Sequence, residues 1–241
     1  MKYVVANLKS SMLKDDVNHY LKTLEKDLIK PNNVIIAPSA LYIQDFINAG
    51  ITTAIQNIYE ENNDSVTGVI TVEQAKSINV PYVIIGHNDK RSLFSENNKV
   101  ILAKIKLALK YNIKVILCVG ETKEHRMLSK TFKVIAEQLS ILSSLDASFM
   151  QDIIIAYEPV WAIGGTETPT NDDIVSIISF IKGTIQKNND SDISVIYGGG
   201  VNRNNATNLK NIAECDGFLF SRAAYQPESF IEVVNTIYSE K

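Results

Sequence analysis

The 241-residue sequence has few cysteines, no long apolar run and no excess of basic residues. Its two cysteines, Cys118 and Cys215, match no metal-binding motif. We expect two free buried thiols, with a disulfide as the alternative. The N-terminal apolar segment is too short for a signal peptide, and no run approaches the ~20 residues that span a membrane. A net charge of −3 gives no reason to expect nucleic acid or an anionic membrane as a partner. These absences predict a cytoplasmic protein.

What the sequence does contain is enough apolar material for a sizeable core. Hydrophobic residues make up 45% of the chain and charged residues 21%, which argues against global disorder. No Pro- or Ser-rich linker divides the sequence, and no repeat is evident beyond an alternation of short and long segments. We therefore expect one domain over residues 1–241.

The alternation consists of short β-branched runs, each followed by a longer segment with helical spacing. Nearly all positions in the short runs are apolar, which is typical of parallel strands buried on both faces. Eight such units in this length predict a (β/α)₈ TIM barrel, which needs about 250 residues. A doubly wound open sheet is the alternative. The expected strands are 3–7, 34–37, 53–56, 82–86, 114–119, 153–158, 194–197 and 217–220, and the clearest helices are 16–29, 97–111, 129–145 and 171–186.

Polar residues follow several of the expected strands. In a barrel the carboxyl ends of the strands share one rim, and active sites lie there. Asn7, Lys9, His87, Glu158 and the glycines 198–200 all occupy such positions. Together they indicate chemistry on a small anionic substrate.

Glu158 ends an apolar strand, where it could be either an ion-paired structural residue or a base. A carboxylate shielded from water is a better proton acceptor near neutral pH. The sequence that follows, 159–170, reads PVWAIGGTETPT. Pro159 and Trp161 are stiff anchors, whereas Gly164 and Gly165 make a small tip, so this segment has the composition of a lid.

The other polar residues at the rim have ordinary explanations as well. An isolated histidine such as His87 is usually structural, and a lysine such as Lys9 is usually solvated. His87 precedes a possible helix N-terminus, whose field disfavours imidazolium, so it would be a neutral hydrogen-bond donor. The turn 197–201, YGGGV, exposes backbone N–H groups that could bind phosphate, although three glycines also make an ordinary loop.

Seven motifs then occur in order: ANLK at 6–9, TG at 67–68, GH at 86–87 with Arg91 and Glu96, CVGET at 118–122, AYEPVWAIG at 156–164, YGG at 197–199 and DGFL at 216–219. In their order and spacing the chain resembles the triosephosphate isomerase family along essentially its whole length. The resemblance implies a TIM barrel that isomerises a small phosphorylated triose. It assigns Glu158 as the base and His87 as the electrophile, with Lys9 supplying positive charge and Asn7 helping to place it. No metal or organic cofactor is implied, and a homodimer through the loop around Thr67 is expected.

The sequence departs from the family pattern mainly at the phosphate end. Gly200 stands where the family has serine, and Ser221–Arg222 replaces a pair of glycines. Side chains there could disturb the close approach of phosphate, or Arg222 could bind it directly. We expect a weakened or rearranged grip formed by Gly164, Gly199, Gly200, Ser221 and Arg222.

Other departures affect the lid and the expected interface. Glu167 adds negative charge to the lid, and Pro169 stiffens its second hinge. Asp89 is one methylene shorter than the usual glutamate, while Val69 and Lys90 replace a charged pair across the family's dimer interface. Two functional alternatives remain: an isomerase of another small sugar phosphate, and a TIM-barrel homologue that binds a ligand with little turnover.

Overall fold

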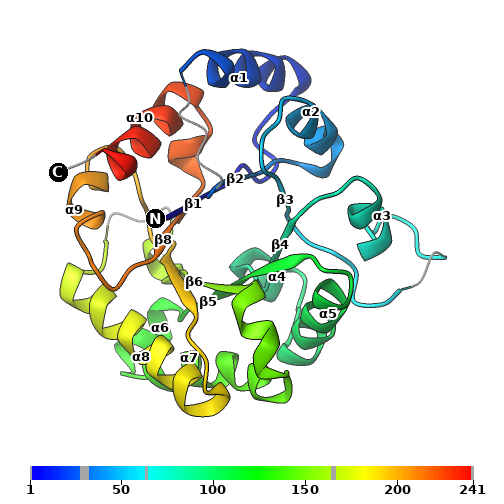
Figure 1. Ribbon diagram of the computed structural model, residues 1–241. Helices are drawn as coiled ribbons and strands as arrows, with labels where there is room; N and C mark the ends of the chain where they lie inside the picture. Colours follow the sequence, from blue (N-terminus) through cyan, green and yellow to red (C-terminus); the bar gives the residue numbers. More distant parts are fainter. Residues whose placement is uncertain (1, 28–32, 63–64, 164–166, 240–241) are drawn as a thin grey trace.

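The computed structural model describes residues 2–27, 33–62, 65–163 and 167–239. Within these ranges eight parallel strands form one sheet in the order β2-β1-β8-β7-β6-β5-β4-β3. Figure 1 looks along the sheet's central axis, with the strands in the middle and the helices around them. The strands are β1 (Tyr3–Asn7), β2 (Val34–Ala37), β3 (Ala54–Ile55), β4 (Tyr82–Ile85), β5 (Lys114–Val119), β6 (Ile153–Tyr157), β7 (Ser194–Tyr197) and β8 (Gly217–Phe220).

The first and last strands of the chain are neighbours in the sheet, because β1 lies between β2 and β8. Val4 of β1 lies opposite Val34 of β2 and also opposite Phe218 of β8. The remaining seam lies between β2 and β3, where Ile36 and Thr53 form a parallel bridge. A ring of paired strands leaves no unprotected edge. The expected TIM barrel is confirmed, and the open doubly wound sheet is excluded.

All eight expected strands occur, and β3 differs most from its expected range. Residues 53–56 were expected, but only Ala54–Ile55 pairs as a strand. Beyond β3 the Gln56 side chain takes over the contacts, because its Nε2 donates to the carbonyls of Lys9 at 2.8 Å and Ala37 at 3.0 Å. Gln56 thereby joins the carboxyl ends of β1 and β2 to β3 at the rim.

Helices connect the successive strands and enclose the barrel (Figure 1). In the described part of the chain none of them is long and apolar enough to cross a bilayer. The α-helices are α1 (Lys14–Asp27), α2 (Ile43–Asn48), α3 (Val72–Ser77), α4 (Asn88–Leu93), α5 (Asn98–Lys110), α6 (Lys123–Met127), α7 (Thr131–Leu139), α8 (Asn171–Asn189), α9 (Ala206–Leu209) and α10 (Pro227–Tyr238). The 3₁₀ helices are η1 (Ala40–Tyr42), η2 (Ser140–Ser144), η3 (Ala147–Asp152), η4 (Val160–Ala162) and η5 (Arg222–Ala224).

The expected helix 129–145 is shorter than its apolar spacing indicated. The α-helix ends at Leu139 and continues as the 3₁₀ helix η2. Serine hydroxyls account for the change: Ser140 donates to the carbonyl of Glu137 at 2.8 Å, and Ser143 to that of Ser140 at 2.7 Å. Such local bonds compete with the α-helical ladder. The expected helix 16–29 begins earlier, at Lys14, and its last two residues lie outside the described residues.

Two apolar layers explain why the strands read as continuously hydrophobic. In β5, Val115, Leu117 and Val119 face the surrounding helices, whereas Ile116 and Cys118 face the barrel interior. Both faces of a barrel strand are therefore buried. Cys118 and Cys215 are buried and unpaired, as expected. The interior is filled by Val5, Ile35, Ala37, Ala54, Ile84, Ile116, Cys118, Ile154, Ala156, Ile196 and Leu219.

Candidate active site

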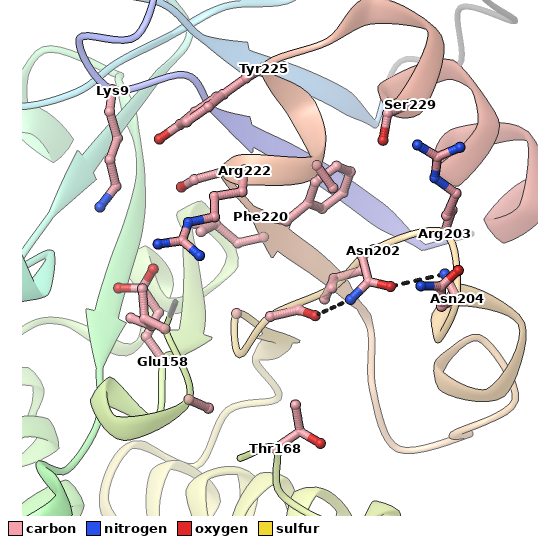
Figure 2. Close-up of a pocket in the computed structure, with 18 of the residues that line it drawn as sticks. Lys9, Glu158, Thr168, Asn202, Arg203, Asn204, Phe220, Arg222, Tyr225 and Ser229 are labelled. Atoms are coloured by element: carbon pink, nitrogen blue, oxygen red, sulfur yellow. Dashed lines mark hydrogen bonds between the residues drawn. The ribbon is translucent and has the colours of Figure 1, made fainter. Parts of the chain in front are cut away.

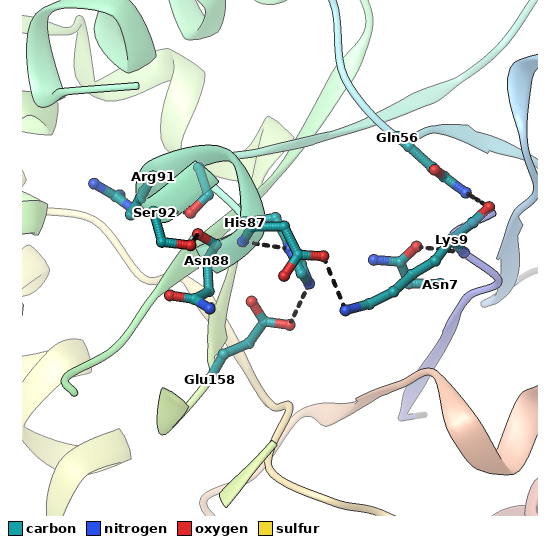
Figure 3. A network of polar contacts seen from close by, with 10 residues as sticks. Asn7, Lys9, Gln56, His87, Asn88, Arg91, Ser92 and Glu158 are labelled. Carbon is teal, nitrogen blue, oxygen red and sulfur yellow. Dashed lines mark hydrogen bonds and ion pairs between the residues drawn. The ribbon is translucent and has the colours of Figure 1, made fainter. Parts of the chain in front are cut away.

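Lys9 stands at the rim in a backbone conformation that requires support. Its φ is +49°, a region that residues other than glycine seldom adopt. The buried Asn7 holds it there, because its Oδ1 accepts a hydrogen bond from the Lys9 N–H at 3.1 Å, and Gln56 binds the Lys9 carbonyl at 2.8 Å. The Lys9 side chain (Figure 3) extends from there to Asp89, with which its Nζ forms a hydrogen bond. Asn7 thus acts on the site by placing Lys9.

The ammonium group of Lys9 is paired with Asp89, 3.0 Å from Nζ to Oδ2. Partial burial alone would raise the pKa of Asp89, but the hydrogen bond from Lys9 together with the neighbouring basic groups outweighs it, and the pKa lies below its usual value. The shorter side chain of aspartate therefore still reaches the lysine. Because the pKa is depressed in the folded state, this pair stabilises the protein above the ordinary pKa of aspartate. That contribution is lost as the pH falls through the lowered value.

His87 caps the N-terminus of α4 with its own ring. Its Nδ1 accepts a hydrogen bond from the N–H of Asp89 at 3.1 Å. A ring nitrogen that accepts carries no proton, so the imidazole is neutral and its proton lies on Nε2. The Asp89 carboxylate is also 3.5 Å from Nδ1, but an ion pair there would need a protonated Nδ1 that could not accept the shorter bond. Nε2–H is therefore free to point at the cavity.

Glu158 follows β6 and is almost completely buried, with 3% of its side chain exposed. Its Oε1 lies 3.6 Å from Nε2 of His87 (Figure 3). Its Oε2 has no hydrogen-bond partner among the described residues. Behind it, burial raises the pKa of the Cys118 thiol, and the negative charge of Glu158 raises it further. A buried carboxylate with an unpartnered oxygen is an acceptor still open to a proton.

Gly198, directly after β7, leaves room for Glu158. A Cβ at this position would lie 2.7 Å from Cγ of Glu158. We expect Gly198→Ala to lower kcat by about 10²-fold, because a base displaced by roughly 1 Å loses its alignment. Gly183→Ala is the matched control: apart from its chain neighbours and the backbone of its own helix, nothing among the described residues lies within 4 Å of the added Cβ, and this exposed position is inside α8.

The control should leave kcat unchanged and raise the free energy of unfolding by about 0.5–1 kcal/mol. Steady-state kinetics and urea unfolding of both variants measure the two effects. An unchanged kcat in Gly198→Ala would show that Glu158 does not depend on this space.

The start of the expected lid is anchored on Glu121. The Oε1 of this buried carboxylate accepts from Trp161 Nε1 at 2.7 Å and from the Tyr157 hydroxyl at 3.2 Å. Burial raises the pKa of Glu121, and these two hydrogen bonds partly offset that effect. Trp161 has a second contact, because the guanidinium of Arg126 lies 4.2 Å from the centre of its ring. The stiff anchor expected at Trp161 is thus held from two directions.

The far side of the expected lid is described from Glu167 onward. Glu167 pairs with Lys123, whose Nζ lies 3.1 Å from Oε1, and both side chains are 62% exposed. The negative charge of Glu167 is therefore paired with the positive charge of a neighbouring lysine. Pro169 is buried just before Thr170, the N-cap of α8. Gly164 and Gly165, expected at the tip, lie outside the described residues.

A cavity of about 830 Å³ connects the expected catalytic and phosphate-binding residues. Its wall includes Lys9, His87, Glu158, Gly200, Ser221 and Arg222. Asn7 is buried and is not among the residues that line it. Gly199 does not line it either: its carbonyl accepts from the Tyr197 hydroxyl, and an added Cβ would lie 2.3 Å from the hydroxyl oxygen of Tyr197.

Gly200 adopts a conformation that favours glycine, with a φ of +79°. Its carbonyl accepts from the side-chain amides of Asn202 and Asn205, each at 3.0 Å. Its N–H has no acceptor among the described residues, and Gly200 is one of the residues that line the cavity. The exchange of serine for glycine therefore accompanies a turn whose backbone can still bind an anion.

Arg222 begins the 3₁₀ helix η5 and extends into the cavity (Figure 2). Neither a hydrogen bond nor an ion pair joins its guanidinium to the described residues. An unpaired guanidinium in a cavity is suited to bind phosphate or carboxylate through two parallel hydrogen bonds. Reasoning from the sequence missed the bracing residues Gln56, Asn202 and Asn205. The amide-rich run 202–205 was the available signal for the last two.

Comparison with known proteins gives one consistent family. A family profile described as Triosephosphate isomerase matches residues 2–237. The triosephosphate isomerase of Coprinopsis cinerea is 37% identical over 217 residues, which cover 87% of this chain and 86% of that protein. Those of Saccharomyces cerevisiae and Aquifex aeolicus are each 33% identical and cover 97% of this chain, and 97% and 98% of their own lengths. The chain therefore belongs to the triosephosphate isomerase family.

Proposed function

We propose that this protein is an aldose–ketose isomerase that interconverts dihydroxyacetone phosphate and D-glyceraldehyde 3-phosphate. The observation that carries the proposal is the facing pair in the cavity: the open carboxylate of Glu158 lies 3.6 Å from Nε2 of a neutral His87. The pair supplies an acceptor for a carbon-bound proton and a donor for the oxygen next to it. Lys9 lines the same cavity and brings positive charge to it.

The reaction follows from these roles. Glu158 removes the proton from the carbon beside the carbonyl, and the electrons of that C–H bond form the double bond of an enediolate. The negative charge moves to the carbonyl oxygen, where Nε2–H of His87 and the ammonium of Lys9 stabilise it. The hydroxyl proton of the first carbon then passes to the oxygen of the second by way of Nε2 of His87, the C=C double bond gives way to the new carbonyl, and Glu158 returns its proton to the second carbon. This pairing of a glutamate base with a neutral histidine is the one for which triosephosphate isomerase is itself the standard example.

The phosphate group would lie at the other wall of the cavity, against the N–H of Gly200, the Ser221 loop and the guanidinium of Arg222. Gly164 would contribute from the lid, and Gly199 acts through packing behind the wall. Arg222 supplies by its side chain the contacts that a pair of glycines makes by backbone in the family pattern. The phosphate-binding site is therefore rearranged and not lost.

Arg222→Gln is expected to raise KM for either triose phosphate by about tenfold and to leave kcat within a few-fold. A hydrogen bond to a charged group is worth about 1.5–3 kcal/mol, and this one forms in the ground state as well as the transition state. Initial-rate kinetics at two salt concentrations measure both constants. Lys106→Gln, at an exposed lysine of α5, is the control for lost charge alone. A KM unchanged by Arg222→Gln would remove Arg222 from the phosphate site.

A coupled assay with each triose phosphate in turn tests the proposed function itself. We expect turnover in both directions. An isomerase of another sugar phosphate would be indicated by higher kcat/KM on a four- or five-carbon phosphate. A binding protein would be indicated by phosphate-dependent binding without turnover.

We further propose that the protein acts as a homodimer that forms through the loops after β1 to β4, including the loop around Thr67. These loops are neighbours because β1 pairs with β2, β2 meets β3, and β3 pairs with β4. Large apolar side chains among them are exposed: Leu13 by 74%, Leu41 by 84%, Leu93 by 75% and Phe94 by 63%. Exposed apolar groups gathered on one side are typical of an interface.

Phe94→Asp is expected to convert the dimer into monomers, because a charge buried in the interface without a partner costs several kcal/mol. Leu128→Asp is the control, since this residue is 54% exposed at the end of α6, outside that group of loops. Sedimentation velocity over a range of concentrations measures the species present. A dimer that survives Phe94→Asp, or a wild-type monomer, would place the interface elsewhere. The cytoplasmic location stays a prediction, which cell fractionation can check.

A further inference from the structure

The cavity extends beyond the groups needed for a triose phosphate. Its volume of about 830 Å³ lies in the range of about 300–1,000 Å³ that suits drug-sized ligands, whereas a triose phosphate has about ten non-hydrogen atoms. Figure 2 shows Glu158 with the side chain of Arg222 beside it on one side of the cavity, and Arg203, Asn204 and Ser229 on the other. We call Arg203, Asn204 and Ser229 the outer subsite.

The outer subsite is built from two segments that meet at the cavity. Arg203 and Asn204 belong to the turn between β7 and α9, and Ser229 lies in the first turn of α10. Asn202 braces this turn: its Oδ1 accepts from the N–H of Asn204 at 2.9 Å, and its Nδ2 donates to the carbonyl of Gly200 at 3.0 Å (Figure 2). The brace fixes the outer subsite relative to the proposed phosphate position at Gly200.

The side chains of the outer subsite are donors with few competing partners. Arg203 Nη1 lies 3.6 Å from Oε2 of Glu232, and both side chains are more than half exposed, so this pair is weak and displaceable. No hydrogen bond joins the side chains of Asn204 or Ser229 to the described residues. Together with the unpaired Arg222, they give the cavity two guanidinium groups and neutral donors, a set that suits the oxygens of phosphate groups.

We propose that the outer subsite binds the second phosphate of a diphosphate, whose first phosphate occupies the position at Gly200 and Arg222. The proposal rests on the proposed function for that first position only. A diphosphate bound in this way excludes the triose phosphate and is a competitive inhibitor. A diphosphate presents two anionic groups to the two arginines of the cavity, whereas a single phosphate presents only one.

Isothermal titration of inorganic pyrophosphate and of orthophosphate into the protein, with EDTA present, tests the proposal directly. We expect pyrophosphate to bind at least about tenfold more tightly. Arg203→Gln combined with Ser229→Ala should abolish that advantage while leaving orthophosphate binding and kcat/KM within about twofold. Lys106→Gln should change none of these values. Adenosine diphosphate serves as a second probe: binding as tight as that of pyrophosphate would indicate an esterified diphosphate, and weaker binding a free one.

Equal affinity for pyrophosphate and orthophosphate would overturn the proposal, and so would an advantage that survives in the double variant. Pyrophosphate inhibition that is not competitive with triose phosphate would also overturn it, because the first phosphate would then lie elsewhere. The titration needs no turnover. If the coupled isomerase assay fails but pyrophosphate still binds more tightly than orthophosphate, the proposed function is rejected and the outer subsite is kept. If the assay succeeds but pyrophosphate has no advantage, the proposed function is kept and the outer subsite is rejected.

Discussion

Glu158→Asp is expected to reduce kcat by about 10²-fold or more and to leave KM within a few-fold. The substitution keeps the carboxylate but withdraws it by one methylene, and a displacement of about 1 Å is enough for such a loss. Burial supports the size of the effect, because only 3% of the side chain is exposed to solvent that could relay the proton. KM changes little because the phosphate contacts lie on the other wall of the cavity.

Glu167→Gln is the matched control, since it removes an exposed carboxylate from the expected lid without touching the cavity interior. Its kcat should stay within about threefold of the wild type, as its ion pair with Lys123 is solvent-exposed. Initial-rate kinetics in both directions give the constants, and a solvent-isotope exchange experiment reports proton removal itself. Full activity in Glu158→Asp would reject Glu158 as the base.

His87→Ala is expected to lower kcat by about 10²–10³-fold, the usual cost of one donor to a developing oxyanion. The same change removes the acceptor for the N–H of Asp89, so the free energy of unfolding should fall by about 1 kcal/mol. His87→Asn separates the two effects. Asparagine caps helices well but is too short to place a donor where Nε2 lies.

The asparagine variant should therefore recover most of the stability and little of the activity. Steady-state kinetics and urea unfolding of both variants measure this difference. If His87→Asn restored kcat together with stability, His87 would be a structural cap and not the electrophile. The structural role that is usual for an isolated histidine would then be the correct interpretation.

The barrel could be predicted from the sequence because its signal is local. Each strand is a short run that is apolar on both faces, as in β5, where alternate residues face the helices and the interior. The positions of Glu158 and His87 could be predicted in the same way, because each lies at the end of such a run. The sequence did not show where the α-helix within residues 129–145 ends, because serine hydroxyls there compete with the helix for backbone carbonyls.

The phosphate end was less predictable, because it depends on backbone conformation and on contacts between distant residues. The sequence showed glycine in place of serine at position 200, but only the structure shows a φ of +79°, which favours glycine. The sequence also offered two outcomes for Arg222. The structure shows its guanidinium in the cavity and unpaired among the described residues, which supports direct binding.

The sequence by itself determined the barrel, the two buried thiols and the carboxylate at the end of β6, since periodicity and residue type are local properties. Only the tertiary structure decided how the site is held. Gln56 binds the carbonyl of Lys9 from 47 residues away, and His87 is set in its neutral form by a backbone N–H. The outer subsite likewise joins residues near 203 to Ser229. Such contacts exist only once β1 has paired with β8 and brought the rim into a ring, because closure places side chains that no local pattern relates.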